Sequence, residues 1–114
     1  KMTTNTINLE EYRLRSGDKF SKVFTGRDRG EMVRKESKID ELERYSDQIT
    51  IIIPKDVYSL NPSFLEELLV NVVLKLGKEM FLEKFKFVSE GDYQYEEPLK
   101  QAIDRILKNN TALD

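Results

Sequence analysis

The chain has 114 residues, of which 35% are charged and 39% hydrophobic, and this predicts one soluble globular domain with a single core. Its 19 basic and 21 acidic residues give a net charge of -2, so the charge balance favours neither nucleic acid nor an anionic membrane as a general partner. The sequence contains no cysteine and no histidine, which excludes disulfides, thiolate metal sites and Ser-His-Asp or Cys-His catalysis.

The first part of the chain predicts short strands. We interpret residues 1–3 as an expression remnant, because a lysine precedes the first methionine. Alternating apolar residues predict a strand at 4–9, and weaker patterns at 10–17 and 20–24 favour two further short strands. We expect a single domain to occupy residues 4–108.

A helix is predicted from Thr25 to about Arg44. Thr25 and Asp28 have the spacing of a capping box, in which two side chains reciprocally bond the first backbone N–H groups. The apolar stripe of this helix is modest and its other positions are charged, so we expect it to be half exposed. Gly30 should weaken the first turn by about 1 kcal/mol relative to alanine.

The run from Ile49 to Gly77 should organise the fold. The residues 49–53 are all β-branched and show no polar alternation, which predicts a central strand covered on both faces. A helical stripe of apolar residues follows at 64–76, and Gly77 is placed to end that helix. A strand at 84–88 would complete a βαβ unit with two parallel strands.

The last segment predicts a helix that starts at Glu96-Glu97-Pro98, where acidic residues suit the positive end of the helix dipole. Its apolar stripe ends near Leu107. We expect residues 109–114 to form a frayed C-terminal tail.

The start of the helix after the central strand is the leading candidate site. Asn61 can be the N-cap with Pro62 at the first helical position. Alternatively, Ser63 is the N-cap and Glu66 completes a capping box. Either arrangement places the Ser63 hydroxyl near unpaired backbone N–H groups, where a phosphate on the serine would be stabilised. An ordinary helix cap is the alternative interpretation. Ser59 is a second candidate hydroxyl, with a plain turn serine as its alternative.

A second candidate site is the turn from Thr25 to Gly30. Backbone N–H groups together with Gly26, Arg27 and Arg29 could hold a phosphate or a carboxylate. The spacing is not that of a P-loop, because no Gly-Lys-Ser/Thr follows. A capped helix start without a ligand is the alternative.

Two stretches resemble a known family. The sequence Asn61-Pro62-Ser63-Phe64-Leu65-Glu66-Glu67-Leu68 after a strand, a proline and a loop resembles the core of the STAS-like family of small bacterial domains of unknown function. Val23-Phe24-Thr25-Gly26-Arg27 resembles the helix start of the same family, and the likeness extends from about Thr6 to Leu107. The resemblance implies an α/β fold with a mixed sheet of four or five strands and about three helices.

The STAS-like family is similar to the anti-sigma-factor antagonists, in which a regulatory serine opens a helix. The resemblance therefore implies a non-enzymatic module of intracellular signalling, whose protein partner is an ATP-binding, serine-kinase-like anti-sigma protein. We expect Ser63 or Ser59 to be the phosphorylated residue. The expected partner-binding residues are Tyr58, Asn61, Pro62 and Phe64.

The rival hypothesis is a sensor of a small anionic ligand or nucleotide, bound at the Thr25 turn. Under either hypothesis we expect no catalytic residue, no metal, no cofactor, no nucleic acid and no membrane partner. No apolar run approaches the ~20 residues of a membrane helix, and no secretory signal is present, so we expect a cytoplasmic location. The oligomeric state stays open.

Overall fold

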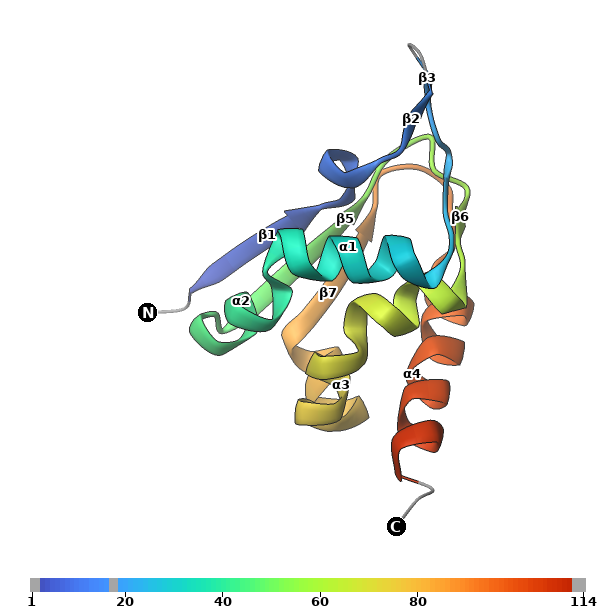
Figure 1. The fold of residues 1–114 in the computed structure, drawn as a ribbon. Coiled ribbons are helices and arrows are strands. Elements are labelled where there is room, and N and C mark those ends of the chain that lie inside the picture. The colour runs from blue at the N-terminus through green and yellow to red at the C-terminus, as the bar shows by residue number, and fades with distance from the viewer. Residues whose placement is uncertain (1–2, 17–18, 112–114) are drawn as a thin grey trace.

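The computed structural model describes residues 3–16 and 19–111 of the chain (Figure 1). The expected α/β class is confirmed, with four α-helices among the described residues. The elements are, in chain order, β1 (Thr4–Asn8), the 3-10 helix η1 (Leu9–Tyr12), β2 (Arg15–Ser16), β3 (Lys19–Phe20), β4 (Val23–Phe24), α1 (Arg27–Ser37), α2 (Ile39–Tyr45), β5 (Gln48–Ile53), β6 (Ser59–Leu60), α3 (Pro62–Lys84), β7 (Phe85–Ser89) and α4 (Glu96–Thr111).

The isoleucine strand β5 lies at the centre of a three-stranded sheet with the order β1-β5-β7. Both neighbours run parallel to β5, and Ile51 pairs with Ile7 on one side and Phe87 on the other. The predicted central strand and the parallel βαβ unit are therefore confirmed. The described residues do not form the expected mixed sheet of four or five strands. The remaining short strands instead form two separate pairs, β2-β3 antiparallel and β4-β6 parallel.

Only one face of the main sheet is packed. Ile49, Ile51 and Ile53 are fully buried, whereas Thr50 and Ile52, on the opposite face, are only partly covered. Figure 1 shows α1, α2 and α3 on the same side of the sheet. The expectation that both faces are covered is therefore wrong. A run of β-branched residues did not require a second helical layer here.

Two helices differ from their predicted bounds. The segment expected as one helix from 25 to 44 is divided at Lys38, whose left-handed backbone (φ 57°) separates α1 from α2 and precedes the fully buried Ile39. Gly77 does leave the helical conformation with a positive φ of 80°, but the chain resumes helical geometry up to Lys84. The glycine therefore kinks α3 instead of ending it.

Helix α3 supplies the largest part of the core. Its buried apolar side chains each stabilise the fold by roughly 1.5–3 kcal/mol before entropy is counted. Gly30 of α1 lets the two helices approach closely, because a Cβ atom at this position would lie 2.4 Å from the carbonyl oxygen of Phe64. The core residues of α3 are Phe64, Leu65, Leu68, Leu69, Val72, Val73 and Phe81.

Helix α4 packs its apolar stripe against α3 and continues to Thr111, so residues 109–111 belong to the helix and not to the tail that we expected. The other residues of that tail, 112–114, lie outside the described residues, as do residues 1 and 2 of the expected remnant. No helix in the described part of the chain is both long and apolar enough to cross a membrane.

Candidate functional site

The two candidate sites of the sequence lie next to each other. Strand β4 pairs with β6 in parallel, with Phe24 opposite Leu60, and each strand leads directly into a helix. The Asn61 N–H donates to the carbonyl oxygen of Phe24 at 2.9 Å. The starts of α1 and α3 are therefore side by side beside β6 (Figure 1). No local sequence signal predicted this pairing, because β6 is only two residues long.

The structure decides between the two capping arrangements at α3. Asn61 is the N-cap, and its Oδ1 atom accepts hydrogen bonds from the Ser63 N–H (2.9 Å) and the Ser63 hydroxyl (2.7 Å). Its carbonyl oxygen accepts from the N–H groups of Phe64 and Leu65. Ser63 thus lies in the first turn of the helix, with its hydroxyl engaged by the cap.

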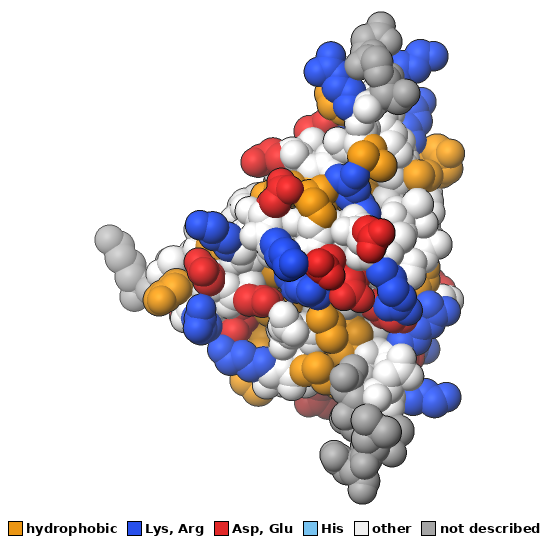
Figure 2. Space-filling model, viewed as in Figure 1, with side chains coloured by type: hydrophobic (Ala, Val, Ile, Leu, Met, Phe, Trp, Pro, Cys, Tyr) orange, Lys and Arg blue, Asp and Glu red, His pale blue; other side chains and the backbone are white. Residues whose placement is uncertain are grey.

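Glu66 has a different role from that of a capping-box partner. Its carboxylate is buried and forms ion pairs with Arg27 of α1 at 2.9 Å and Arg105 of α4 at 3.4 Å. A buried carboxylate is costly unless it is paired, so these two guanidinium groups explain why Glu66 does not reach back to Ser63. Arg27 also pairs with Glu67 at 3.5 Å. Figure 2 shows acidic and basic side chains interleaved across this face of the helices.

The expected partner-binding residues divide into exposed and buried groups. Tyr58 is 65% exposed, Asn61 is exposed, and Pro62 is partly exposed. Phe64 is fully buried and packs against Phe24 with ring centroids 5.1 Å apart, so it does not present a surface to a partner. It begins the apolar stripe of α3, and that stripe faces the core. The candidate hydroxyl residues Ser63 and Ser59 are both partly exposed.

Arg13 fixes the loop in front of Tyr58, a role that the sequence did not indicate. Its side chain is 3% exposed and makes two hydrogen bonds to the Asp56 carboxylate, at 2.8 and 2.9 Å. The same guanidinium group donates twice to the carbonyl oxygen of Ser21. The hydrogen bond from Arg13 also holds the pKa of Asp56 below its ordinary value. Arg13 and Asp56 are separated by 43 positions in the sequence, which explains why no local pattern revealed the pair.

The Thr25 turn borders a hollow of about 450 Å³, to which Leu14 also contributes. Gly26, with φ 92°, is the N-cap of α1 and makes no side-chain capping bond, so the expected Thr25–Asp28 capping box does not form. Arg29 lines the hollow, and its Nε atom is buried without a hydrogen-bond partner among the described residues. Arg27, which we expected to hold an anion here, is engaged by Glu66 instead.

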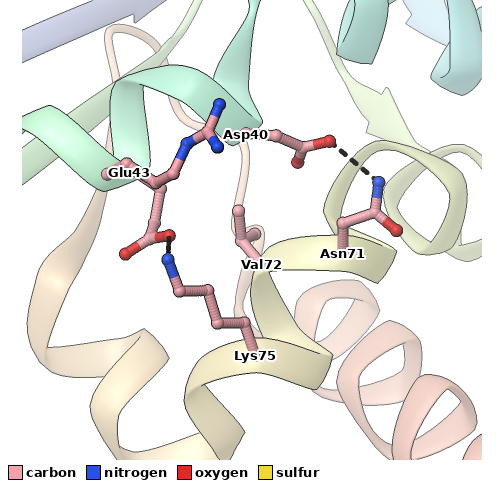
Figure 3. A pocket seen from close by; sticks show the side chains of 6 residues that line it. Asp40, Glu43, Asn71, Val72 and Lys75 are labelled. Carbon is pink, nitrogen blue, oxygen red and sulfur yellow. Dashed lines mark hydrogen bonds and ion pairs between the residues drawn. The ribbon is translucent and has the colours of Figure 1, made fainter.

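A second hollow, of about 300 Å³, lies between α2 and α3 (Figure 3). Glu43 is buried there and accepts hydrogen bonds from the ammonium groups of Lys75 (2.7 Å) and Lys84 (2.8 Å). Burial raises the pKa of Glu43, but the hydrogen bonds and the positive charges of Lys75 and Lys84 together lower it by more, so the net effect is a pKa below the ordinary value. Asn71 likewise donates to Asp40 at 2.8 Å. These contacts join α2 to α3.

Among the described residues, no group of three acidic, histidine or cysteine side chains is placed to hold a metal ion. No family model matches the chain, and neither a curated protein nor a solved structure matches it. The likeness to STAS-like domains stays a prediction from the sequence.

Proposed function

We propose that the protein is a non-enzymatic interaction module that binds a protein partner through the start of α3. The α3 docking surface comprises Tyr58, Asn61, Pro62 and Ser63. The observation that carries the proposal is the 65% exposure of Tyr58 beside the exposed cap of α3. An aromatic side chain on a fixed loop is the type of residue that contributes most to protein–protein interfaces.

The loop that presents Tyr58 is held at both ends. The Tyr58 N–H donates to the carbonyl oxygen of Lys22 at 2.9 Å, and Arg13 holds Asp56 two residues earlier. On the other side, the Tyr93 hydroxyl accepts from the Leu60 N–H at 3.0 Å. A loop fixed in this way loses little conformational entropy when a partner binds. The resemblance to STAS-like domains suggests an ATP-binding, serine-kinase-like anti-sigma protein as that partner.

Ser63 is the proposed regulatory residue. A phosphate would add a charge of roughly -1.5 to -2 at the positive end of the α3 dipole, so the modified protein should stay folded. The same charge would oppose docking against an acidic partner surface. Ser59, in β6, is the second candidate for the modification.

The test is incubation with a cognate serine kinase and ATP, followed by mass spectrometry of the peptide that contains residues 54–64. Phosphate on Ser63, with partner binding lost in Ser63→Glu and kept in Ser63→Ala, would support the switch. If every hydroxyl in the segment stays unmodified, the switch is wrong, although the docking surface could still be tested by Tyr58→Ala.

A second candidate function is the binding of a small anion or nucleotide at the Thr25 turn. Two features favour it: the Arg29 Nε atom is buried without a hydrogen-bond partner among the described residues, and no side chain caps the start of α1 there. A ligand present at a hundred times its Kd should stabilise the protein by about 2.7 kcal/mol, which a thermal shift would detect. The shift should vanish in Arg29→Gln. No shift with inorganic phosphate or with nucleoside triphosphates would contradict this function.

A further inference from the structure

An apolar groove lies between the last part of α3 and the first turns of α4, two helices that pack against each other (Figure 1). Its volume is about 360 Å³, which falls within the range of small-molecule sites. From α4 it is lined by Leu99 and Ile103, which are one turn apart and both buried. Leu82, which is 40% exposed, lines it from α3. None of these residues belongs to the α3 docking surface.

The parts of the chain that border the groove are fixed in place. Both residues that α3 contributes, Lys78 and Leu82, follow the kink at Gly77, so the direction that the helix takes there positions them. Tyr95, just before α4, also lines the groove. Its ring stacks on that of Phe87 with centroids 5.4 Å apart, and its hydroxyl donates to the carbonyl oxygen of Phe87 at 3.2 Å. A preformed groove of this kind reduces the entropy lost when a ligand binds.

Two lysines beside the groove lack a counter-charge. Lys78 of α3 and Lys100 of α4 both line it, and both are exposed. Neither ammonium group forms an ion pair or a hydrogen bond with any residue that the structure describes. By contrast, Lys75 and Lys84, on the same helix as Lys78, both bind the carboxylate of Glu43. The two cations at the groove are therefore available to an added anion.

One carboxylate, that of Glu96, also lines the groove. It lies in the first turn of α4, where the positive end of the helix dipole stabilises an acidic side chain. With Lys78 and Lys100, the lining has two cations and one anion, which gives a net charge of +1. The groove therefore favours an anionic head group over a cationic one.

We propose that the groove between α3 and α4 binds the acyl chain of a monomeric anionic amphiphile, such as a fatty-acid carboxylate. The chain lies against Leu82, Leu99 and Ile103, and the head group pairs with the lysines at the groove. Between Tyr95 and Ile103 the axis of α4 rises by roughly 12 Å, a length that suits a medium-length chain such as that of decanoate.

The dimensions of the groove favour an acyl chain over a helix from a partner protein. An α-helix with its side chains is about 10 Å across, so only one row of its side chains could enter the groove. An acyl chain is narrower and can lie in the groove along its length. Removing the whole chain from water then drives the binding.

Isothermal titration calorimetry with decanoate, below its micelle concentration, tests the site. We expect one saturable site per protein chain. Octanoate, which is shorter by two methylene groups, should bind about tenfold more weakly, because each buried methylene group strengthens binding about threefold. Decanol has the same chain length without the charge and should also bind about tenfold more weakly than decanoate.

A pair of leucine variants tests whether the chain lies in the groove. Leu82→Gln should weaken decanoate binding about tenfold, because it removes an apolar side chain from the groove. Leu74→Gln is the matched control, since Leu74 is 41% exposed on the same helix and does not line the groove. It should change binding less than twofold. Circular dichroism checks that both variants are folded.

A pair of double-lysine variants tests the head-group contact. Lys78→Gln with Lys100→Gln should weaken decanoate binding about tenfold. Lys55→Gln with Lys108→Gln removes the same charge from exposed positions outside the groove and should change binding less than twofold. All four lysines are exposed, so neither variant disturbs the core.

Four results would overturn the proposal. The first is no saturable binding of decanoate by the folded parent protein. The second is equal binding of decanoate by Leu82→Gln and Leu74→Gln. The third is binding of decanol as tight as that of decanoate, which would contradict the pairing of the head group with the lysines. The fourth is co-sedimentation with phosphatidylglycerol vesicles by protein that does not bind decanoate, which would assign the groove to a membrane surface.

Discussion

The ammonium group of Lys84 lies 2.8 Å from the carboxylate of Glu43 and 2.6 Å from the carbonyl oxygen of the same residue. The contact joins the end of α3, beyond the kink at Gly77, to α2. Lys75, before the kink, reaches the same carboxylate at 2.7 Å. One buried acid therefore holds both segments of the kinked helix.

Glu43→Gln should destabilise the protein by about 2 kcal/mol at neutral pH, because hydrogen bonds to charged groups contribute more than neutral ones and Lys84 would lose its counter-charge. Urea denaturation measures the change. Glu41→Gln, an exposed residue on α2, is the control and should stay within about 0.5 kcal/mol of the parent protein. Equal stability of the Glu43 variant and the parent would show that the ion pairs contribute nothing.

The stabilisation from Glu43 should depend on pH. Its pKa is lower in the folded state than the ordinary value of 4.5, so folding favours the ionised form. The contribution is present above pH 4.5 and is lost as the pH falls through the lower, folded-state pKa. The difference in unfolding free energy between the parent and Glu43→Gln should therefore shrink as the pH is lowered from 4.5 through the folded-state pKa of Glu43. A difference that grows on acidification would contradict the assignment.

Gly30→Ala should destabilise the protein by about 1–3 kcal/mol, although alanine is the better helix former by about 1 kcal/mol. The added Cβ would lie 2.4 Å from the Phe64 carbonyl oxygen and 2.8 Å from Cβ of Glu67, so α1 and α3 would have to separate. Thermal unfolding shows whether Gly30→Ala lowers or raises the stability. Glu36→Ala, at an exposed position of α1, is the control; a Gly30 variant as stable as that control would mean that the helices are not in close contact.

The two residues at the start of α3 should differ in their effect on stability. Asn61→Ala removes the acceptor of two hydrogen bonds and should cost about 1 kcal/mol. Ser63→Ala leaves the Asn61 cap in place and should cost only a few tenths. Denaturant titration measures the loss of unfolding free energy in each variant. A larger loss in Ser63→Ala than in Asn61→Ala would identify Ser63 as the N-cap.

The central strand and the helices that flank it were predictable because their patterns are local. A run of β-branched residues specifies a strand, and a stripe with the helical period specifies α3 and α4. The prediction for Gly77 was confirmed in one respect, because the glycine adopts a positive φ, but the helix continues beyond it. Beyond the kink, Phe81 is fully buried and its ring stacks on that of Phe85 with centroids 4.7 Å apart, a contact that favours continuation of the helix. The tendency of glycine to end helices is a local property, so it could not predict this contact between Phe81 and Phe85.

The candidate site was less predictable because long-range pairs determine it. Glu66 fits a capping box by spacing, but Arg27 and Arg105 are each 39 residues away and bind it instead. Phe64 was expected both as a partner-binding residue and as the first residue of the apolar stripe. It is fully buried, so it belongs to the core. Strands β2 and β3 were expected as part of one sheet, but among the described residues they pair with each other and form a separate two-stranded sheet.

The α3 docking surface is tested most directly by a quantitative pull-down from native extract with three forms of the protein. The parent and Tyr45→Ala, which removes a tyrosine on α2 that is 75% exposed, should retain the same partner. Tyr58→Ala should lose that partner while keeping the parent's circular dichroism spectrum and unfolding midpoint. Recovery of the same partner in equal amount by all three folded proteins would contradict the proposal that the start of α3 is the docking surface.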